Sequence, residues 1–281
     1  MPSFDFALLN QGYKLHHADW NFGPICSGFS RIYWVDKGCA SVIINGRQHG
    51  LTPGHLYLIP TLLTHYDRND TDFGHYYVHF LDRTKKILEY YERYALPFQV
   101  DAVHADHAII HRLMELCPSV SLTNSQPSAY DTSITTLEAT RRYQSQPLGI
   151  RMEVSSLLQQ LLSRFFVHAR QRHKVDDERI AHTLYVIEKN LSDVPDLDHL
   201  AADVSLCKHS FIRLFKRQMG TTPTDYVIRQ RIHRAQMQFI DGENSVKRVA
   251  LSLGYDNISY FSRLFKKVTD VSPKEFIRQN C

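Results

Sequence analysis

Hydrophobic and polar residues follow two different periods along this chain of 281 residues. The first 82 residues hold short stretches rich in aromatic and β-branched side chains, which predict strands. Turn signals separate them, and Asn45-Gly46 is a strong signal for a two-residue hairpin. Short strands at this spacing are typical of a sandwich or a small barrel. The predicted strands include Arg31–Val35, Ala40–Ile44, His55–Ile59 and His75–Phe80.

Residues 83–172 change to a helical pattern with few glycines. We expect helices near 83–95, 104–116, 129–143 and 150–172. The last of these carries a wide apolar stripe, which is either core or a surface for a partner helix. The stripe consists of Val154, Leu157, Leu158, Leu161, Leu162, Phe165 and Phe166. We predict that residues 83–172 form a linker and dimerisation region and that the protein is a homodimer.

A polar stretch at 173–178 predicts a linker, and a compact helical region follows it. This region nearly repeats itself, because the sequence Phe-Ile-Arg-Leu-Phe-Lys at 211–216 returns 50 residues later as Phe-Ser-Arg-Leu-Phe-Lys at 261–266. Upstream the match is offset by 49, since Leu200-Ala201 pairs with Val249-Ala250, so the second copy has one extra residue in its turn. The repeat indicates one helical unit used twice.

Each copy predicts a helix with two distinct faces. In the first copy Phe211, Leu214 and Phe215 form the buried stripe at i, i+3, i+4, and in the second copy Phe261, Leu264 and Phe265 do so. The opposite stripe is polar and basic, which is the geometry of a recognition helix that enters the major groove. The candidate DNA-binding residues are Lys208, His209, Ile212, Arg213, Lys216, Asn257, Ser259, Ser262, Arg263 and Lys266.

Particular roles follow from the chemistry of these side chains. Arg213 and Arg263 suit bidentate contacts to guanine, and Lys216 and Lys266 suit phosphates. Asn257 is also a plausible N-cap. Thr222-Pro223 predicts the start of an intervening helix that runs to Ile240. Such a helix can hold two recognition helices near one DNA turn apart.

Charge is distributed unevenly around the repeat. Residues 176–206 hold 8 acidic and 2 basic residues, a balance of −6, whereas residues 207–267 hold 12 basic and 4 acidic residues, a balance of +8. This is the footprint of a protein that binds a phosphate backbone. Five cysteines without CxxC spacing, an N-terminus unlike a signal peptide and the lack of a long apolar run predict a cytoplasmic protein that does not enter membranes.

The C-terminal third resembles the tandem helix-turn-helix domain of the AraC/XylS family of bacterial transcription regulators. The second copy carries the motif Ala250-x3-Gly254-Tyr255-x3-Ser259-x-Phe261-x-Arg263-x-Phe265-Lys266-x5-Ser272-Pro273-x2-Phe276. The sequence departs from the family pattern at Cys207, where Ser is usual as a cap, and at Asp270, where Gly is common. The resemblance implies binding to double-stranded DNA and to RNA polymerase, and most members are activators.

The N-terminal part resembles the ligand-sensing cupin domains of the same family through Pro53-Gly54-x5-Pro60-x4-His65. The His-x-His pair of metal-dependent cupins is missing, so we expect no metal, no cofactor and no catalytic residues. His75, Tyr77 and His79 share one face of a strand. In a sugar-responsive member, residues similar to Tyr66, His75 and Tyr77 contact the sugar, and a contacting Arg is replaced here by Gly23. The candidate ligand-binding residues are Arg31, Tyr33, Tyr66, His75 and Tyr77.

Together these patterns predict a two-domain α+β protein. Residues 1–82 form a cupin-like ligand-sensing barrel, 83–172 the helical dimerisation and linker region, and 176–281 an all-α double helix-turn-helix domain. The predicted function is sequence-specific DNA binding by a regulator, most simply an activator, that a small molecule such as a sugar controls. Two alternatives stay open: a regulator whose barrel only dimerises, and a cupin-type metalloenzyme.

Overall fold

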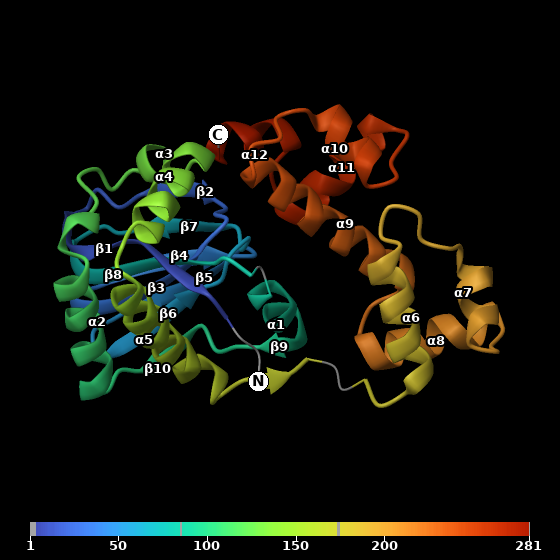
Figure 1. Cartoon of the computed structure of the whole chain (residues 1–281), viewed down its shortest axis with the longest axis horizontal. Coiled ribbons are helices and arrows are strands. Elements are labelled where there is room, and N and C mark those ends of the chain that lie inside the picture. Colours follow the sequence, from blue (N-terminus) through green and yellow to red (C-terminus); the bar gives the residue numbers. More distant parts are fainter. Residues whose placement is uncertain (1–3, 85, 173–174, 281) are drawn as a thin grey trace. The chain divides into compact units, whose positions relative to one another are not determined.

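The computed structural model describes residues 4–84, 86–172 and 175–280 and contains two compact bodies (Figure 1). One consists mainly of Met1–Arg170, and the other of Gln171–Arg278. The first two residues of the predicted linker, 173 and 174, lie outside the described residues, as do the start of the first predicted domain and the end of the last.

Two antiparallel sheets build the first body. The larger sheet has the strand order β1-β8-β3-β6-β10 and the smaller one β2-β7-β4-β5. The four strands predicted from composition are β3, β4, β6 and β8. The strands of the larger sheet are β1 (Phe6–His17), β8 (Asp72–Asp82), β3 (Ser30–Gly38), β6 (His55–Ile59) and β10 (Gln99–Asp101); those of the smaller are β2 (Phe22–Ile25), β7 (His65–Arg68), β4 (Ala40–Ile44) and β5 (Arg47–Leu51). A short ribbon pairs β9 (Tyr94–Ala95) with β11 (Arg170–Gln171).

The strand spacing of residues 1–82 predicted a sandwich or a small cupin-like barrel, and no closed barrel is found among the described residues. The strand pairings of the described residues form two separate sheets, and the larger sheet takes its edge strand β10 from beyond residue 82. The alternation of side chains along a strand shows which face is buried, but not whether the sheet closes on itself. A three-residue strand also carries too few positions to display a period.

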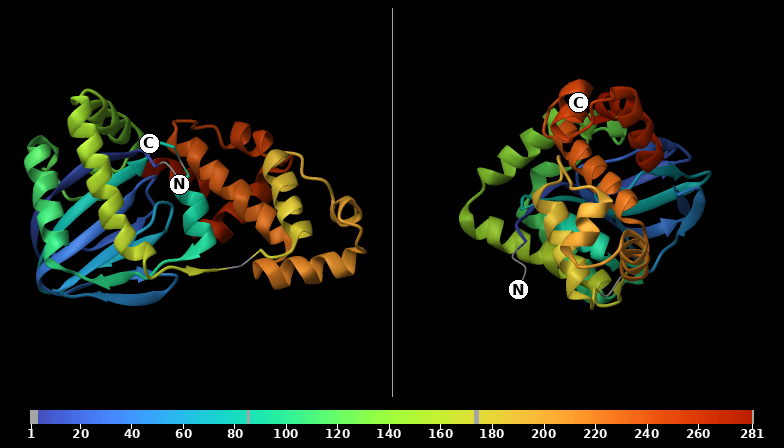
Figure 2. Two further views of the ribbon diagram at one scale, coloured as in Figure 1. Left: turned by 60° about the horizontal axis from the view of Figure 1, so that its bottom comes forward. Right: turned by 90° about the vertical axis from the view of Figure 1, so that its right-hand side faces the viewer.

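Helices from the middle of the chain cover the larger sheet. Helices α2 and α5 pack against each other and against β1, and α4 also packs on β1 (Figure 2). The helices of this body are α1 (Ile87–Arg93), α2 (His104–Leu116), the 3₁₀ turn η1 (Pro118–Val120), α3 (Pro127–Tyr130), α4 (Ser133–Gln144) and α5 (Leu148–Phe166).

The apolar stripe of α5 belongs to the core. Val154, Leu158 and Phe165 are fully buried, in one cluster with Phe6 of β1 and Leu113 of α2. The stripe therefore leaves no uncovered surface for a partner helix. The dimer was predicted because this stripe would otherwise be exposed, and that reason is wrong. Among the large exposed apolar side chains of this region, four lie on α4 and the start of α5, namely Ile134, Leu137, Leu148 and Met152, and the other two are Val103 and Val167.

The second body is helical from Glu178 onward. Its central helix α9 contacts α8, α10 and α11, and it spans the residues predicted from Pro223 to Ile240. Thr222 caps it, since its side chain accepts from the backbone N–H of Asp225. The helices are α6 (Glu178–Lys189), α7 (Leu197–Asp203), α8 (Lys208–Met219), α9 (Pro223–Ile240), α10 (Val246–Ser252), α11 (Ile258–Thr269) and α12 (Pro273–Asn280). Among the described residues, no helix has the length and apolar character needed to cross a membrane.

Candidate functional site

The two copies of the repeat fold into the same backbone turn. In the first copy the N–H of Leu206 donates to the carbonyl of Ala201 at 2.9 Å, and in the second the N–H of Tyr255 donates to that of Ala250 at 3.0 Å. The preceding residue has a left-handed backbone in both, with φ of 56° at Ser205 and 77° at Gly254. All three pairs of positions are 49 residues apart, so the turns are equivalent.

The extra residue of the second copy can now be located. Helix α8 follows its N-cap Cys207, and α11 follows its N-cap Asn257, which is 50 residues later. Because the turns are offset by 49 and the caps by 50, the inserted residue is Asp256, between Tyr255 and the cap. The insertion lies outside both helices and leaves their faces in register.

Each recognition helix buries the predicted stripe. Phe211 and Phe215 of α8 and Phe261 and Phe265 of α11 are fully buried, and Leu214 and Leu264 are also buried. The predicted opposite stripe faces outward in both helices. The exposed candidates are Lys208, His209, Arg213, Lys216, Asn257, Ser259, Arg263 and Lys266, whereas Ile212 and Ser262 are half-buried.

Local contacts distinguish these candidates further. Ile212 packs against the core of this body, and Ser262 donates its hydroxyl to the carbonyl of Ile258 at 2.9 Å. The side chain of Asn257 accepts from the N–H of Tyr260 at 2.9 Å, so Asn257 is the N-cap that the sequence predicted. Lys208 forms an ion pair of 2.8 Å with Asp198. Arg213 with Arg263 and Lys216 with Lys266 are thus exposed cationic pairs at equivalent positions, as are Arg217 and Lys267 one residue further along.

An aromatic neighbour of the second arginine was missed by sequence reasoning. The guanidinium of Arg263 lies 5.9 Å from the ring centre of Tyr260, which is itself 44% exposed. This cation–π contact restricts the arginine at little cost. Position 210, which is equivalent to Tyr260, holds a serine, so the repeat itself gives no signal for this residue.

The second turn also binds the segment that precedes the first unit. A Cβ at Gly254 would collide with the carbonyl oxygen of Ser192, so only glycine fits there. Arg231 of α9 donates to the carbonyls of Leu191 at 2.7 Å and Ser192 at 3.2 Å, and its guanidinium lies 5.2 Å from the ring centre of Tyr255. The Gly254-Tyr255 motif therefore connects the two helix-turn-helix units to each other.

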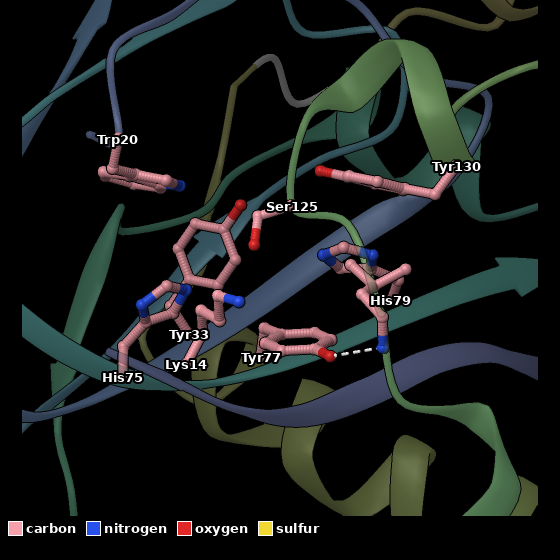
Figure 3. A pocket seen from close by; sticks show the side chains of 9 residues that line it. Lys14, Trp20, Tyr33, His75, Tyr77, His79, Ser125 and Tyr130 are labelled. Carbon is pink, nitrogen blue, oxygen red and sulfur yellow. Dashed lines mark hydrogen bonds between the residues drawn. The ribbon is translucent and has the colours of Figure 1, made fainter. Parts of the chain in front are cut away.

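The first body has a small, partly open polar chamber lined by strands β1, β3 and β8 of the larger sheet, by Trp20 and by the segment between α2 and α4. In the register of β3 and β8, Tyr33 pairs with Tyr77 and Arg31 with His79, so these side chains share one face. The cavity has about 20 Å³ of water-accessible volume, room for about one water. Lys14, Trp20, Tyr33, His75, Tyr77, His79, Leu122, Ser125 and Tyr130 line it (Figure 3).

Of the five predicted ligand-binding residues, Tyr33, His75 and Tyr77 line this cavity, and Arg31 and Tyr66 do not. Arg31 is buried and forms an ion pair of 2.8 Å with Asp131. Tyr66 packs over Gly23, where an added Cβ would lie 2.6 Å from the Tyr66 ring. This close packing and the φ of 127° at Gly23 leave no room for a side chain at this position.

Sequence reasoning missed several residues of the chamber. Lys14 comes from β1, and Leu122, Ser125 and Tyr130 come from the segment between α2 and α4. Loop residues that are distant in sequence carry no periodic signal, so no pattern in the chain marks them.

Burial controls the protonation of the chamber. It lowers the pKa of His75 to about 3, lowers that of His79 well below its ordinary value, and lowers that of His65 on β7 to about 3. It raises the pKa of Asp67 to about 7, although Arg31 and Arg68 act in the opposite direction. The imidazoles are thus neutral at physiological pH and can both donate and accept hydrogen bonds.

Several polar atoms of this region have no hydrogen-bond partner among the described protein groups. They are both ring nitrogens of His79, Nδ1 of His75, Nε2 of His65 and Nε of Arg31. Buried polar atoms without partners are costly, so the chamber suits a polar guest. No group of three or more His, Cys, Asp or Glu side chains in the described ranges is arranged to hold a metal ion.

Comparison with known proteins gives matches in both bodies. A family model described as a helix-turn-helix domain matches residues 200–279. The arabinose operon regulatory protein of Salmonella typhimurium is 31% identical over 131 residues, which is 46% of each chain. The MmsAB operon regulatory protein of Pseudomonas aeruginosa is 37% identical over 81 residues, 29% of this chain and 26% of that protein. The chain spans half or less of these curated relatives.

The solved structures extend the likeness to the whole fold. ToxT from Vibrio cholerae O395 has a TM-score of 0.54 and 13% identity, and the match covers 98% of each chain. ToxT of strain SCE256, solved with an unsaturated fatty acid bound, has a TM-score of 0.50 and 13% identity over 100% of this chain and 98% of that one. At this identity the likeness concerns the fold alone. The duplicated helix-turn-helix units, the matching family model and the named relatives show that residues 200–279 form a helix-turn-helix domain similar to those of AraC/XylS-family transcriptional regulators.

Proposed function

We propose that this protein binds duplex DNA sequence-specifically through α8 and α11 and that a small molecule in the chamber of the first body controls this binding. One observation carries the DNA-binding part of the proposal. The two turns have equivalent hydrogen bonds, and the helices after them expose the same residue types at equivalent positions, Arg213 with Arg263 and Lys216 with Lys266. Packing alone does not require duplicated exposed cations.

The chemistry of the exposed faces supports major-groove recognition. Arg213 and Arg263 lie one and a half turns into their helices, with the long side chains and planar donors that suit the O6 and N7 atoms of guanine. Lys216 and Lys266 follow three residues later, nearer the helix ends, and suit phosphates. The balance of +8 over residues 207–267 adds the sequence-independent attraction.

The test uses the full-length protein and a pool of random duplexes, from which the preferred site is selected. We expect Arg213→Ala and Arg263→Ala each to weaken binding to that site about 5- to 150-fold, which corresponds to about 1–3 kcal/mol for a lost bidentate pair. Lys216→Ala should weaken all sequences alike and reduce the salt dependence. Lys189→Ala, an exposed cation on α6, is the matched control.

The result that opposes this proposal is unchanged sequence preference in both arginine variants. A failure of the wild-type protein to bind any duplex at low salt would oppose it as well, because phosphate contacts are strongest there.

The chamber supports the sensing part of the proposal. Its neutral imidazoles and tyrosines can bond a sugar or another polar molecule, and one relative is named for an arabinose operon. The present cavity holds about one water, so a larger guest needs a lining segment to move. The alternative is a first body that senses nothing. A thermal-shift screen separates the two, since a bound ligand raises the melting temperature.

We also propose a homodimer that acts in the cytoplasm, contacts RNA polymerase and activates transcription. With the α5 stripe buried, the surface that favours self-association is the exposed apolar group of Ile134, Leu137, Leu148 and Met152. Light scattering should show a dimer at micromolar concentration, and Ile134→Lys combined with Met152→Lys should give a monomer. A wild-type monomer, or a dimer that the double variant leaves intact, would contradict this assignment.

A further inference from the structure

The segment between α2 and α4, residues 118–131, covers part of the chamber, and we call it the strap. It contributes three of the residues that line the cavity, Leu122, Ser125 and Tyr130 (Figure 3). The strap contains only the 3₁₀ turn η1 and the single turn α3. Its hold on the chamber therefore depends on individual side-chain contacts rather than on a regular element.

Three contacts fix the strap to the chamber wall. The N–H of Leu122 donates to the hydroxyl of Tyr77 at 2.7 Å. The ring of Tyr130 stacks on His79, with centroids 5.2 Å apart and an interplanar angle of 23°. Each wall residue, Tyr77 and His79, is one that a polar guest would use.

The third contact is ionic. The carboxylate of Asp131 accepts from the Arg31 guanidinium at 2.8 Å and also from the hydroxyl of Ser27. Arg31 and Asp131 are 1% and 7% exposed at their side chains. A buried guanidinium that loses its carboxylate is strongly destabilising, so Arg31 requires an anion whether or not the strap is in place.

The strap therefore presents what a ligand would present: a hydrogen-bond partner for Tyr77 and a flat ring for His79 in the chamber wall, and a carboxylate for Arg31, which pairs with His79 in the sheet but does not itself line the cavity. The contact with Asp131 also leaves one donor of the guanidinium unused, because the Nε of Arg31 has no partner among the described groups. A free carboxylate that binds Arg31 through two parallel hydrogen bonds would be held more tightly than a single-oxygen contact. Lys14 lines the same cavity and adds a second cation.

We propose that the effector is a small hydroxylated carboxylate of the sugar-acid class, that its carboxylate replaces Asp131 on Arg31, and that its binding releases the strap. Its hydroxyls bond to Tyr77, His79 and His75, whose polar atoms face the cavity. This inference rests on the sensing part of the proposed function and names the class of molecule that is sensed. The strap is then a built-in competitor, which covers part of the chamber until the acid is present.

The test uses galacturonate as the probe and galactose as its neutral counterpart, with three full-length proteins. These are the wild type, Asp131→Asn, and the double variant Arg31→Gln with Asp131→Asn, which replaces the ion pair by two neutral amides of similar size. Binding is measured by tryptophan fluorescence, since Trp20 lines the cavity. Opening of the strap is measured by hydrogen exchange at the amide of Leu122.

We expect the wild type to bind galacturonate about tenfold or more tightly than galactose, as charge-assisted hydrogen bonds outweigh neutral ones. Asp131→Asn should bind galacturonate more tightly still, because the competitor is gone, and the double variant should lose the preference. Galacturonate should speed exchange at Leu122 in the wild type.

Three results would overturn the proposal: equal affinity for the two sugars in the wild type, an unchanged preference in the double variant, or protection of Leu122 that persists at saturation. If Asp131→Asn does not fold, as circular dichroism will show, the wild type and the double variant still decide between these outcomes. No DNA is present in this assay. A failed gel shift would therefore count against the DNA-binding proposal alone, and a failed galacturonate titration against this inference alone.

Discussion

At the scale of single residues, the buried histidines make the first body sensitive to acid. The folded state holds His65 and His75 with pKa values of about 3, against an ordinary value near 6.5. As the pH falls, these histidines become protonated in the unfolded state before they do so in the folded state. The stability that they contribute is therefore present above about pH 6.5 and is lost as the pH falls. Asp67 acts in the opposite direction, since its pKa of about 7 lets the folded state bind a proton that the unfolded chain releases.

We therefore predict that the first body loses stability between pH 7 and pH 5, because the lowered pKa values of the deeply buried His65, His75 and His79 outweigh the raised pKa of Asp67. His65 and His75 each contribute about 2 kcal/mol to this loss. His75→Gln should reduce the loss by about that amount. Urea unfolding followed by tryptophan fluorescence checks this, since both tryptophans, Trp20 and Trp34, lie in the first body. If His75→Gln lost as much stability between pH 7 and pH 5 as the wild type does, the loss could not be assigned to the buried His75.

The sequence predicted part of the chamber at this scale. Strand alternation was sufficient to place His75, Tyr77 and His79 on one face of their strand, and all three line the cavity. It could not predict that the carboxylate of Asp131 neutralises Arg31, since the two residues are 100 positions apart and nothing local connects them. The ligand role of Tyr66 was taken from a resemblance, and its packing over Gly23 shows how one changed neighbour alters such a residue's surroundings.

At the scale of elements, the recognition helices followed their predicted faces because the i, i+3, i+4 rule is local. The same rule predicted the α5 stripe correctly. It could not show whether the stripe packs into the core or against a partner helix, because that depends on the sheet that covers it. The structure also shows what the departure from the family pattern at Asp270 does to the backbone. Asp270 takes the left-handed backbone, with φ of 64°, that Gly220 takes with φ of 66° in the first copy.

The N-cap of α8, Cys207, forms no side-chain capping bond with a backbone amide, and its thiol donates instead to the hydroxyl of Ser210 at 3.3 Å. We predict that Cys207→Ser stabilises the start of α8 by about 0.5–1 kcal/mol, since a serine hydroxyl accepts from the first free amides. The reverse change in the second copy, Asn257→Cys, should destabilise α11 by a similar amount. Hydrogen exchange of the α8 and α11 amides measures both effects, and unchanged α8 protection in Cys207→Ser would contradict the first.

At the scale of the whole molecule, the sequence predicted two bodies and a strand-rich N-terminal half, because composition changes abruptly along the chain. The closure of the sheets and the addition of β10 depend on long-range pairing, which alternation does not encode. The repeat showed that one unit is used twice. It did not show that Gly254 and Arg231 connect the two units through Ser192. Those contacts make both recognition helices parts of one compact body.

The central claim is that α8 and α11 read two separate segments of one DNA site. Helix α9 has 18 residues, and at 1.5 Å a residue it is about 27 Å long, which suits contacts in successive major grooves about 34 Å apart. Guanine-methylation interference on the selected site tests this most directly, because the methyl group is added at N7 in the major groove. We predict two clusters of interfering guanines about 10 base pairs apart, of which Arg213→Ala removes one and Arg263→Ala the other. A single cluster, or two clusters that both arginine variants leave intact, would contradict the account.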